Sequence, residues 1–89
     1  GKKFDAKMFL AKIYISLKSS VNDPEGITIQ SSLSQLGFES VTSVRTGKYI
    51  EIKISEKDKN VAEKKIEEMC EKLLSNPVIE TYKFDLDIL

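Results

Sequence analysis

A strict alternation of apolar and polar residues near the middle of the chain most limits what this sequence can fold into. Isoleucines occupy every second position, at Ile50, Ile52 and Ile54, with polar side chains between them. Because successive side chains of a strand point to opposite faces, this spacing predicts a half-buried strand over 48–54. Just before it, Arg45-Thr46-Gly47-Lys48 places a glycine between two cations, where we expect the chain to turn or bulge.

Three further segments have the character of strands. Alternating apolar residues from Phe9 to Leu17 predict a strand over 9–18, and a similar alternation predicts another over 78–88. A short strand over 41–45 is expected to lead into the central one.

Two helices are predicted between these strands. Asp23 suits the N-cap of the first helix and Pro24 its first position, while Gly37 is placed to end it. The apolar stripe of this helix consists of Ile29, Leu33 and Leu36. The second helix, capped by Asp58 or Asn60, carries a stripe made of Ala62, Ile66, Met69, Cys70, Leu73 and Leu74.

The predicted order is therefore β-α-β-β-α-β. With right-handed crossovers, the simplest compact arrangement is the ferredoxin-like α+β fold, a four-stranded antiparallel sheet with two helices on one face. No linker or repeat interrupts the 89 residues, so we expect a single domain over 1–89. Residues 1–7 are polar and are interpreted as either an expression remnant or a flexible N-terminal extension.

Composition excludes several classes of function. Fourteen cations balance fourteen carboxylates, and zero net charge argues against a nucleic-acid partner. No apolar run is long enough to span a membrane, and a single cysteine fits a reducing cytoplasm. The absence of histidine removes the commonest general base and metal ligand, so no catalytic residues, metal site or bound cofactor are predicted.

The remaining reactive residues have ordinary explanations. Cys70 lies on the apolar stripe of the second helix and is expected to be a buried core thiol. Gly47-Lys48 lacks the companion residues of a phosphate-binding loop. Two classes of function stay open: a protein-docking subunit, or a small-ligand regulatory domain of ACT type. The segment Asp23-Pro24-Glu25-Gly26 loosely resembles the helix start of an ACT-type domain.

The sheet face away from the two helices also predicts self-association. Aromatic and aliphatic side chains rimmed by charges are typical of an interface between chains. We therefore expect a homo-oligomer, a dimer or a dimer of dimers. The predicted contact residues are Leu10, Tyr14, Tyr49 and Ile79.

Taken together, the motifs resemble the PurS family. The resemblance rests on three segments in register, 21–26, 44–51 and 69–82, and extends over about residues 8 to 86. Asn22 and Thr46 depart from the family pattern, which commonly has a leucine and an aliphatic residue there.

The resemblance implies a non-catalytic small subunit of phosphoribosylformylglycinamidine synthase, an enzyme of de novo purine synthesis. Such a subunit bridges a synthetase subunit, which uses ATP and magnesium, and a glutaminase subunit, and it supports ammonia transfer between them. The residues that match the family motifs are expected at the contacts with these partners. They are Asp23, Gly26, Arg45, Gly47 and Lys48.

Overall fold

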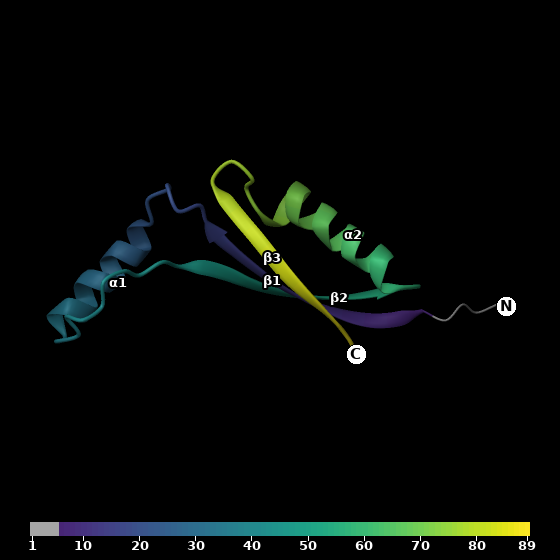
Figure 1. Ribbon diagram of the computed structural model, residues 1–89, viewed down its shortest axis with the longest axis horizontal. Helices are drawn as coiled ribbons and strands as arrows, with labels where there is room; N and C mark the ends of the chain where they lie inside the picture. Colours follow the sequence, from purple (N-terminus) through teal and green to yellow (C-terminus); the bar gives the residue numbers. More distant parts are fainter. Residues whose placement is uncertain (1–5) are drawn as a thin grey trace.

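The computed structural model describes residues 6–89, so the predictions for residues 1–5 lie outside the described part. Two helices and three strands follow one another along this part of the chain (Figure 1). Their bounds are β1 Lys7–Leu17, α1 Pro24–Gln35, β2 Gly47–Glu56, α2 Lys59–Met69 and β3 Glu80–Ile88. A π-helical turn, η1 (Cys70–Leu74), extends α2.

The three strands form one antiparallel sheet in the order β2-β1-β3. The central strand β1 pairs with both neighbours, so that Phe9 lies opposite Ile54 on one side and opposite Ile88 on the other. The predicted alternation at 48–54 is confirmed, because the isoleucines of β2 are half-buried while Tyr49, Glu51 and Lys53 are exposed.

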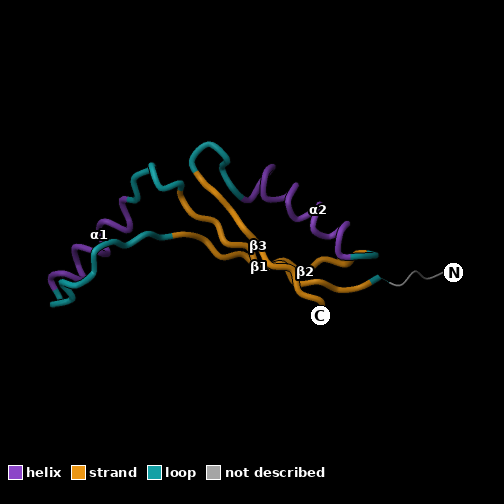
Figure 2. The backbone as a smooth tube through the Cα atoms, viewed as in Figure 1, coloured by secondary structure: helices purple, strands orange, loops and turns teal. Residues whose placement is uncertain are grey.

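The core lies between α2 and one face of the sheet, called the inner face from here on. Fully buried side chains of β1 contact an equally buried stripe on α2, and Figure 2 shows α2 running above the strands. The buried residues are Phe9, Ala11, Ile13, Ile15, Ala62, Ile66, Cys70 and Leu86. Asp58 is the N-cap of α2 and accepts a hydrogen bond from the Val61 amide at 2.9 Å.

The π-helical turn changes the end of the predicted apolar stripe. The Ser75 amide donates to the carbonyl of Cys70 at 2.9 Å, a bond that spans one more residue than an α-helical one. Cys70 is completely buried, as predicted. Leu73, however, is 81% exposed, so its expected place on the buried stripe is wrong.

The predicted ferredoxin-like arrangement with a four-stranded sheet is also wrong, because residues 41–45 do not form a strand within the described chain. Pairing between β1 and β2 begins only at Gly47, opposite Ser16. The segment before it returns alongside α1, where the Gln30 side chain donates to the Val41 carbonyl at 3.4 Å. Its backbone groups are therefore turned toward the helix and its N-cap.

The prediction that both helices cover one face of the sheet fails for the same reason. Only α2 lies on the sheet, whereas α1 projects beyond one end of it (Figure 1). We call residues 18–46 the arm: the outgoing loop, α1 and the returning segment. The described chain is accordingly elongated, measuring 64 × 26 × 15 Å.

Candidate functional site

The arm joins the sheet where the outgoing and returning segments lie next to each other, a place we call the arm base. The structure brings together there all five residues that the family motifs marked as partner contacts. Asp23 and Gly26 come from the start of α1, Arg45 from the returning segment, and Gly47 and Lys48 from the start of β2.

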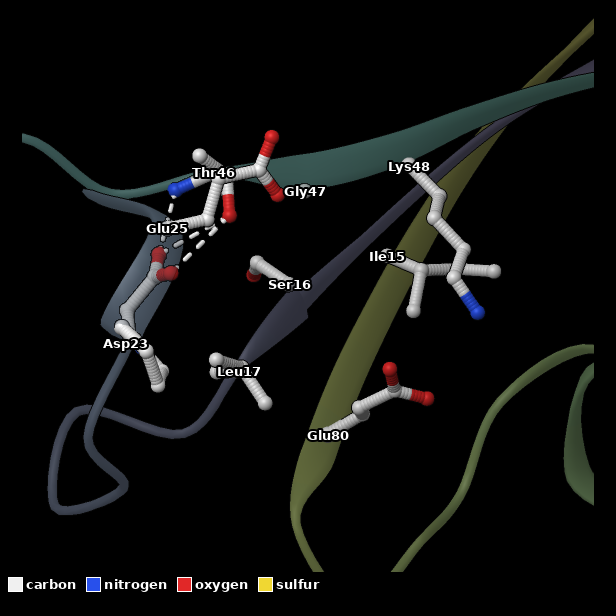
Figure 3. Close-up of a pocket in the computed structure, with 10 residues that line it drawn as sticks. Ile15, Ser16, Leu17, Asp23, Glu25, Thr46, Gly47, Lys48 and Glu80 are labelled. Carbon is white, nitrogen blue, oxygen red and sulfur yellow. Dashed lines mark hydrogen bonds between the residues drawn. The ribbon is translucent and has the colours of Figure 1, made fainter. Parts of the chain in front are cut away.

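Asp23 ties the two segments of the arm base together (Figure 3). Its Oδ1 accepts the Gly26 amide at 2.9 Å, which confirms the predicted N-cap. Its Oδ2 accepts the Thr46 amide at 2.6 Å, and the Thr46 hydroxyl donates to the same carboxylate at 3.0 Å. These hydrogen bonds, the one from the Thr46 amide foremost, hold the pKa of Asp23 below its ordinary value of 3.8.

Arg45 fastens the outgoing loop from the other side. Its guanidinium donates to the carbonyls of Lys18 at 3.0 Å and Val21 at 2.8 Å. A charged donor shared by two backbone acceptors holds the loop more firmly than a neutral one would. Of the two cations on either side of Gly47, Arg45 is thus hydrogen-bonded within its own chain.

The glycines of the arm base are explained by close packing of backbone. A Cβ on Gly47 would lie 2.6 Å from the carbonyl oxygen of Ile15, and a Cβ on Gly26 would overlap the carbonyl oxygen of Val44. The expected turn at Gly47 is wrong, because this residue begins β2 in extended pairing. Among the described residues only Gly37 has a positive φ, 101°, which confirms it as the residue that ends α1.

Beside the arm base lies a cleft of about 420 Å³ that opens on the inner face. Ile15 and Leu17 give it an apolar floor, and the charged residues Glu25, Lys48 and Glu80 surround them. Figure 3 shows Lys48 and Glu80 coming from different strands toward this space. The cleft therefore suits a group that is apolar where it meets the floor and polar where it meets the charged residues around the opening.

The outer face of the sheet, opposite α2, carries the residues predicted for self-association. The rings of Tyr14 and Tyr49 are in contact, tilted by 42° with their centroids 5.1 Å apart, and the Lys83 ammonium lies 5.8 Å from the centroid of the Tyr14 ring. The hydroxyl of Tyr49 donates to Glu51 at 2.8 Å, and this bond raises the pKa of Tyr49 to about 12. Leu10 belongs to the same face of β1, whereas Ile79 lies just before β3, where its carbonyl accepts the Lys18 amide.

Sequence reasoning missed three participants in the arm base. Thr46 is not among the residues predicted at the partner contacts, yet it supplies two of the hydrogen bonds to Asp23. Lys18 and Val21 contribute only main-chain carbonyls, which leave no signal in a sequence. The hydroxyl of Thr46 is the one sign of these contacts that the sequence itself carries.

The arm base holds backbone segments in place and exposes part of the arm. Among residues 6–89, no group of three or more histidine, cysteine or carboxylate side chains is placed to hold a metal ion, and no helix is long and apolar enough to span a membrane. Hydrogen bonds at the arm base fix the start of the arm, and the arm exposes apolar side chains. Fold and arm base together define a small α+β protein with a projecting helical arm.

Comparison with known proteins identifies the family. The model of the PurS family, described as phosphoribosylformylglycinamidine (FGAM) synthase, matches residues 10–87. The chain belongs to the PurS family, which confirms the resemblance seen in the motifs and favours the docking subunit over the ACT-type domain.

Its relatives cover nearly the whole chain. The phosphoribosylformylglycinamidine synthase subunit PurS of Synechocystis is 45% identical over 78 residues, 88% of this chain and 78% of that protein. PurS of Methanocaldococcus jannaschii, one of the subunits of formylglycinamide ribonucleotide amidotransferase in the purine biosynthetic pathway, superposes with a TM-score of 0.82 at 43% identity. That superposition covers 91% of this chain and 98% of the other.

A third relative comes from an assembly. In the structure of PurLQS from Thermotoga maritima, one chain matches with a TM-score of 0.80 and 33% identity. The match covers 92% of this chain and 98% of that one. The extended shape with its projecting arm is therefore similar to that of one chain in the Thermotoga maritima PurLQS structure.

Proposed function

We propose that this chain is the non-catalytic small subunit of a phosphoribosylformylglycinamidine synthase complex in de novo purine synthesis. The observation that carries the proposal is the likeness to a chain of the Thermotoga maritima PurLQS structure, which this chain matches over nearly its full length. In the complex, the subunit bridges the synthetase and glutaminase subunits and supports the transfer of ammonia between them.

The chemical step is assigned to the partners. The synthetase subunit uses ATP and magnesium, and the glutaminase subunit releases ammonia from glutamine, in the cytoplasm. This chain contributes contact surfaces, which fits an arm base whose hydrogen bonds hold backbone in place.

Within the arm base, the roles of the five candidate residues divide. Lys48 is exposed at the cleft and is the side chain that we place against a partner subunit. Asp23, Gly26, Arg45 and Gly47 support that contact by holding the surrounding backbone.

Reconstitution with the synthetase and glutaminase subunits tests the proposal. The untagged chain should co-purify with both, and Lys48→Glu should lower glutamine-dependent synthesis by at least about tenfold, because reversing an interfacial charge weakens association. Ammonia-dependent synthesis should fall less, since free ammonia does not need the bridge. The control is Lys64→Glu on the exposed side of α2. Failure of the wild-type chain to co-purify would refute the proposal.

Self-association through the outer face belongs to the same proposal. The residues that we place at this contact are the tilted Tyr14–Tyr49 pair, Leu10 beside it and Ile79 at the end of the sheet. Light scattering should report a mass of at least two chains at micromolar concentration. The Tyr14→Ser/Tyr49→Ser variant should shift that mass downward, whereas a wild-type mass equal to one chain would remove the contact.

A further inference from the structure

The chain carries its most exposed large apolar side chains where it passes from η1 into β3. Of the large apolar residues within 6–89, Leu73 at 81% and Val78 at 77% have the largest exposed fractions. Leu73 lies on η1, and Val78 lies on the loop that follows, residues 75–79, which we call the η1–β3 loop (Figure 1). Single exposed apolar residues are ordinary, but two of this size at one end of a molecule form a candidate contact surface.

Asn76 is the centre of the hydrogen bonds that shape the η1–β3 loop. Its side-chain oxygen accepts the Val78 amide at 3.0 Å, and its carbonyl accepts the amides of Ile79 at 3.1 Å and Glu80 at 2.7 Å. Its own amide donates to the Glu80 carboxylate at 2.7 Å. A loop whose shape is already fixed loses little conformational entropy when a partner binds it.

The same bonds use every backbone donor of the loop. Each N–H from Ser75 to Glu80 donates a hydrogen bond within the chain, and Pro77 has no N–H. The hydroxyl of Ser75 also donates, to the Cys70 carbonyl at 2.9 Å. Burying a donor that has no partner costs free energy, so a loop with all its donors bonded can be covered by apolar surface at low cost.

The backbone groups that remain available here are acceptors. A helix leaves its last carbonyls without intrahelical partners, and the amides that follow η1 are used within the loop. The carboxylates of Glu71 and Glu80 come just before and just after this segment, while the nearby Lys72 is paired with Glu68 at 2.6 Å. A complementary surface is therefore an apolar pocket edged by N–H donors or cations.

The η1–β3 loop adjoins the cleft beside the arm base. The Glu80 carboxylate that accepts the Asn76 amide also lines this cleft, together with Lys48. On the other side, the Lys18 amide donates to the Ile79 carbonyl at 2.8 Å and so joins the loop to the end of β1. The loop and Lys48 thus belong to one continuous surface, and a single partner can contact both.

We infer that the η1–β3 loop is a preformed docking element whose Leu73 and Val78 enter an apolar pocket, edged by hydrogen-bond donors, on the partner subunit that Lys48 contacts. The two apolar side chains form the centre of this contact, and Glu80 and Lys48 lie at its polar rim. The inference rests on the proposed function, because it names the surface through which this chain binds one subunit of the synthase complex.

The first test removes the apolar side chains from the full chain. Leu73→Ser/Val78→Ser should raise the dissociation constant for the reconstituted synthetase–glutaminase partners at least about tenfold, because side chains at the centre of an interface contribute most to affinity. The matched control is Ile88→Ser/Leu89→Ser, which changes residues that are 64% and 61% exposed at the opposite end of β3 and should bind like the wild type. Unchanged binding by the loop variant would overturn the inference.

The second test addresses the fixed shape of the loop. Asn76→Ala removes the bond to the Val78 amide but keeps both apolar side chains, and it should weaken binding severalfold. Asn76→Asp keeps an acceptor oxygen for that amide and should bind close to the wild type. Equal binding by Asn76→Ala and the wild type would overturn the claim that the loop is preformed.

The third test identifies the occupant. A photoreactive p-benzoylphenylalanine replaces Val78 in one preparation and Lys48 in another, and each is irradiated in the reconstituted complex. Both positions should cross-link to the same partner subunit. Cross-links to two different subunits, or from position 78 only to a second copy of this chain, would overturn the inference.

The outcomes separate this inference from the proposed function. A wild-type chain that fails to co-purify with the synthetase and glutaminase subunits overturns both. A wild-type chain that co-purifies, with a Leu73→Ser/Val78→Ser variant that binds equally well, overturns only the docking role of the η1–β3 loop.

Discussion

The single carboxylate of Asp23 has two structural roles. It caps α1 through the Gly26 amide, and it also accepts both the amide and the hydroxyl of Thr46 from the returning segment. A helix cap is normally a local feature, but here the same group joins two segments of the chain. The direction in which the arm leaves the sheet therefore depends on this residue.

Replacing Asp23 by Asn should loosen the arm base. The amide nitrogen of Asn cannot accept the Thr46 N–H, so we expect the folding equilibrium constant to fall about tenfold in urea unfolding. The wild-type pKa is lowered from 3.8, so its stabilisation is complete above that value and is lost as pH falls through the folded-state pKa. The variant should lack this acid dependence.

Thr46→Ser is the matched control for that experiment, because it keeps the hydroxyl and the amide that Asp23 accepts. It should unfold close to the wild type at neutral pH. An Asp23→Asn variant with wild-type stability and an unchanged acid profile would show that the carboxylate is not what holds the arm base.

A methyl group at Gly26 should also disturb the arm base. The new Cβ would overlap the Val44 carbonyl oxygen, and the two backbones would have to separate. We expect Gly26→Ala to lower the free energy of unfolding by about 1–3 kcal/mol, as overpacking does elsewhere. Ser34→Ala, at an exposed position of the same helix, should be neutral or slightly stabilising. Equal midpoints in urea for both variants would contradict the proposed backbone contact.

At the scale of elements, α2 and its π-helical turn separate residues that look equivalent in the sequence. Ile66 and Leu73 are both members of the predicted stripe, yet Ile66 is completely buried and Leu73 is largely exposed. The π-helical turn Cys70–Leu74 lies at this end of the stripe, where Leu73 is exposed while Leu74 packs against the core.

Alanine substitutions should reveal this difference. Ile66→Ala leaves a cavity in the core and should cost about 2–5 kcal/mol of unfolding free energy. Leu73→Ala should change it by less than about 0.5 kcal/mol, as is usual at exposed positions. Urea midpoints measure both, and a cost at Leu73 similar to that at Ile66 would place Leu73 in the core after all.

The elements that sequence predicted correctly depend on local information. The alternation around Ile50, Ile52 and Ile54 reports a strand with one buried face, and the Asp23-Pro24 pair reports a helix start. Neither needs any knowledge of the distant chain. The position of Gly37 at the end of α1 is predictable for the same reason.

The errors concern contacts between distant segments. Residues 41–45 have the composition of a strand, but no strand pairs with them. The amide of Thr46, which follows them, donates a hydrogen bond to Asp23 instead. The bonds from Arg45 to Lys18 and Val21 join main-chain carbonyls that every residue possesses. The five candidate residues could be named from family motifs, whereas their intrachain partners required the structure.

At the scale of the whole molecule, the elongated shape should survive when the chain is alone. If the Tyr14→Ser/Tyr49→Ser variant dissociates to single chains, small-angle scattering should give a radius of gyration near the 17.9 Å of the structure. The arm base predicts this, because its hydrogen bonds do not involve a second copy. A radius near about 12 Å would mean that the arm folds back onto its own sheet.

The position of β1 at the centre of the sheet has a consequence for how the protein is made. Its two neighbours are β2 and β3, and Phe9 lies opposite Ile88, so the first strand that the structure describes pairs with the last one it describes. While the ribosome is still translating β3, one edge of β1 has no partner and its apolar side chains stay accessible. Completion of the sheet must wait for release of the C-terminal strand, and until then the nascent chain exposes an edge that chaperones can recognise.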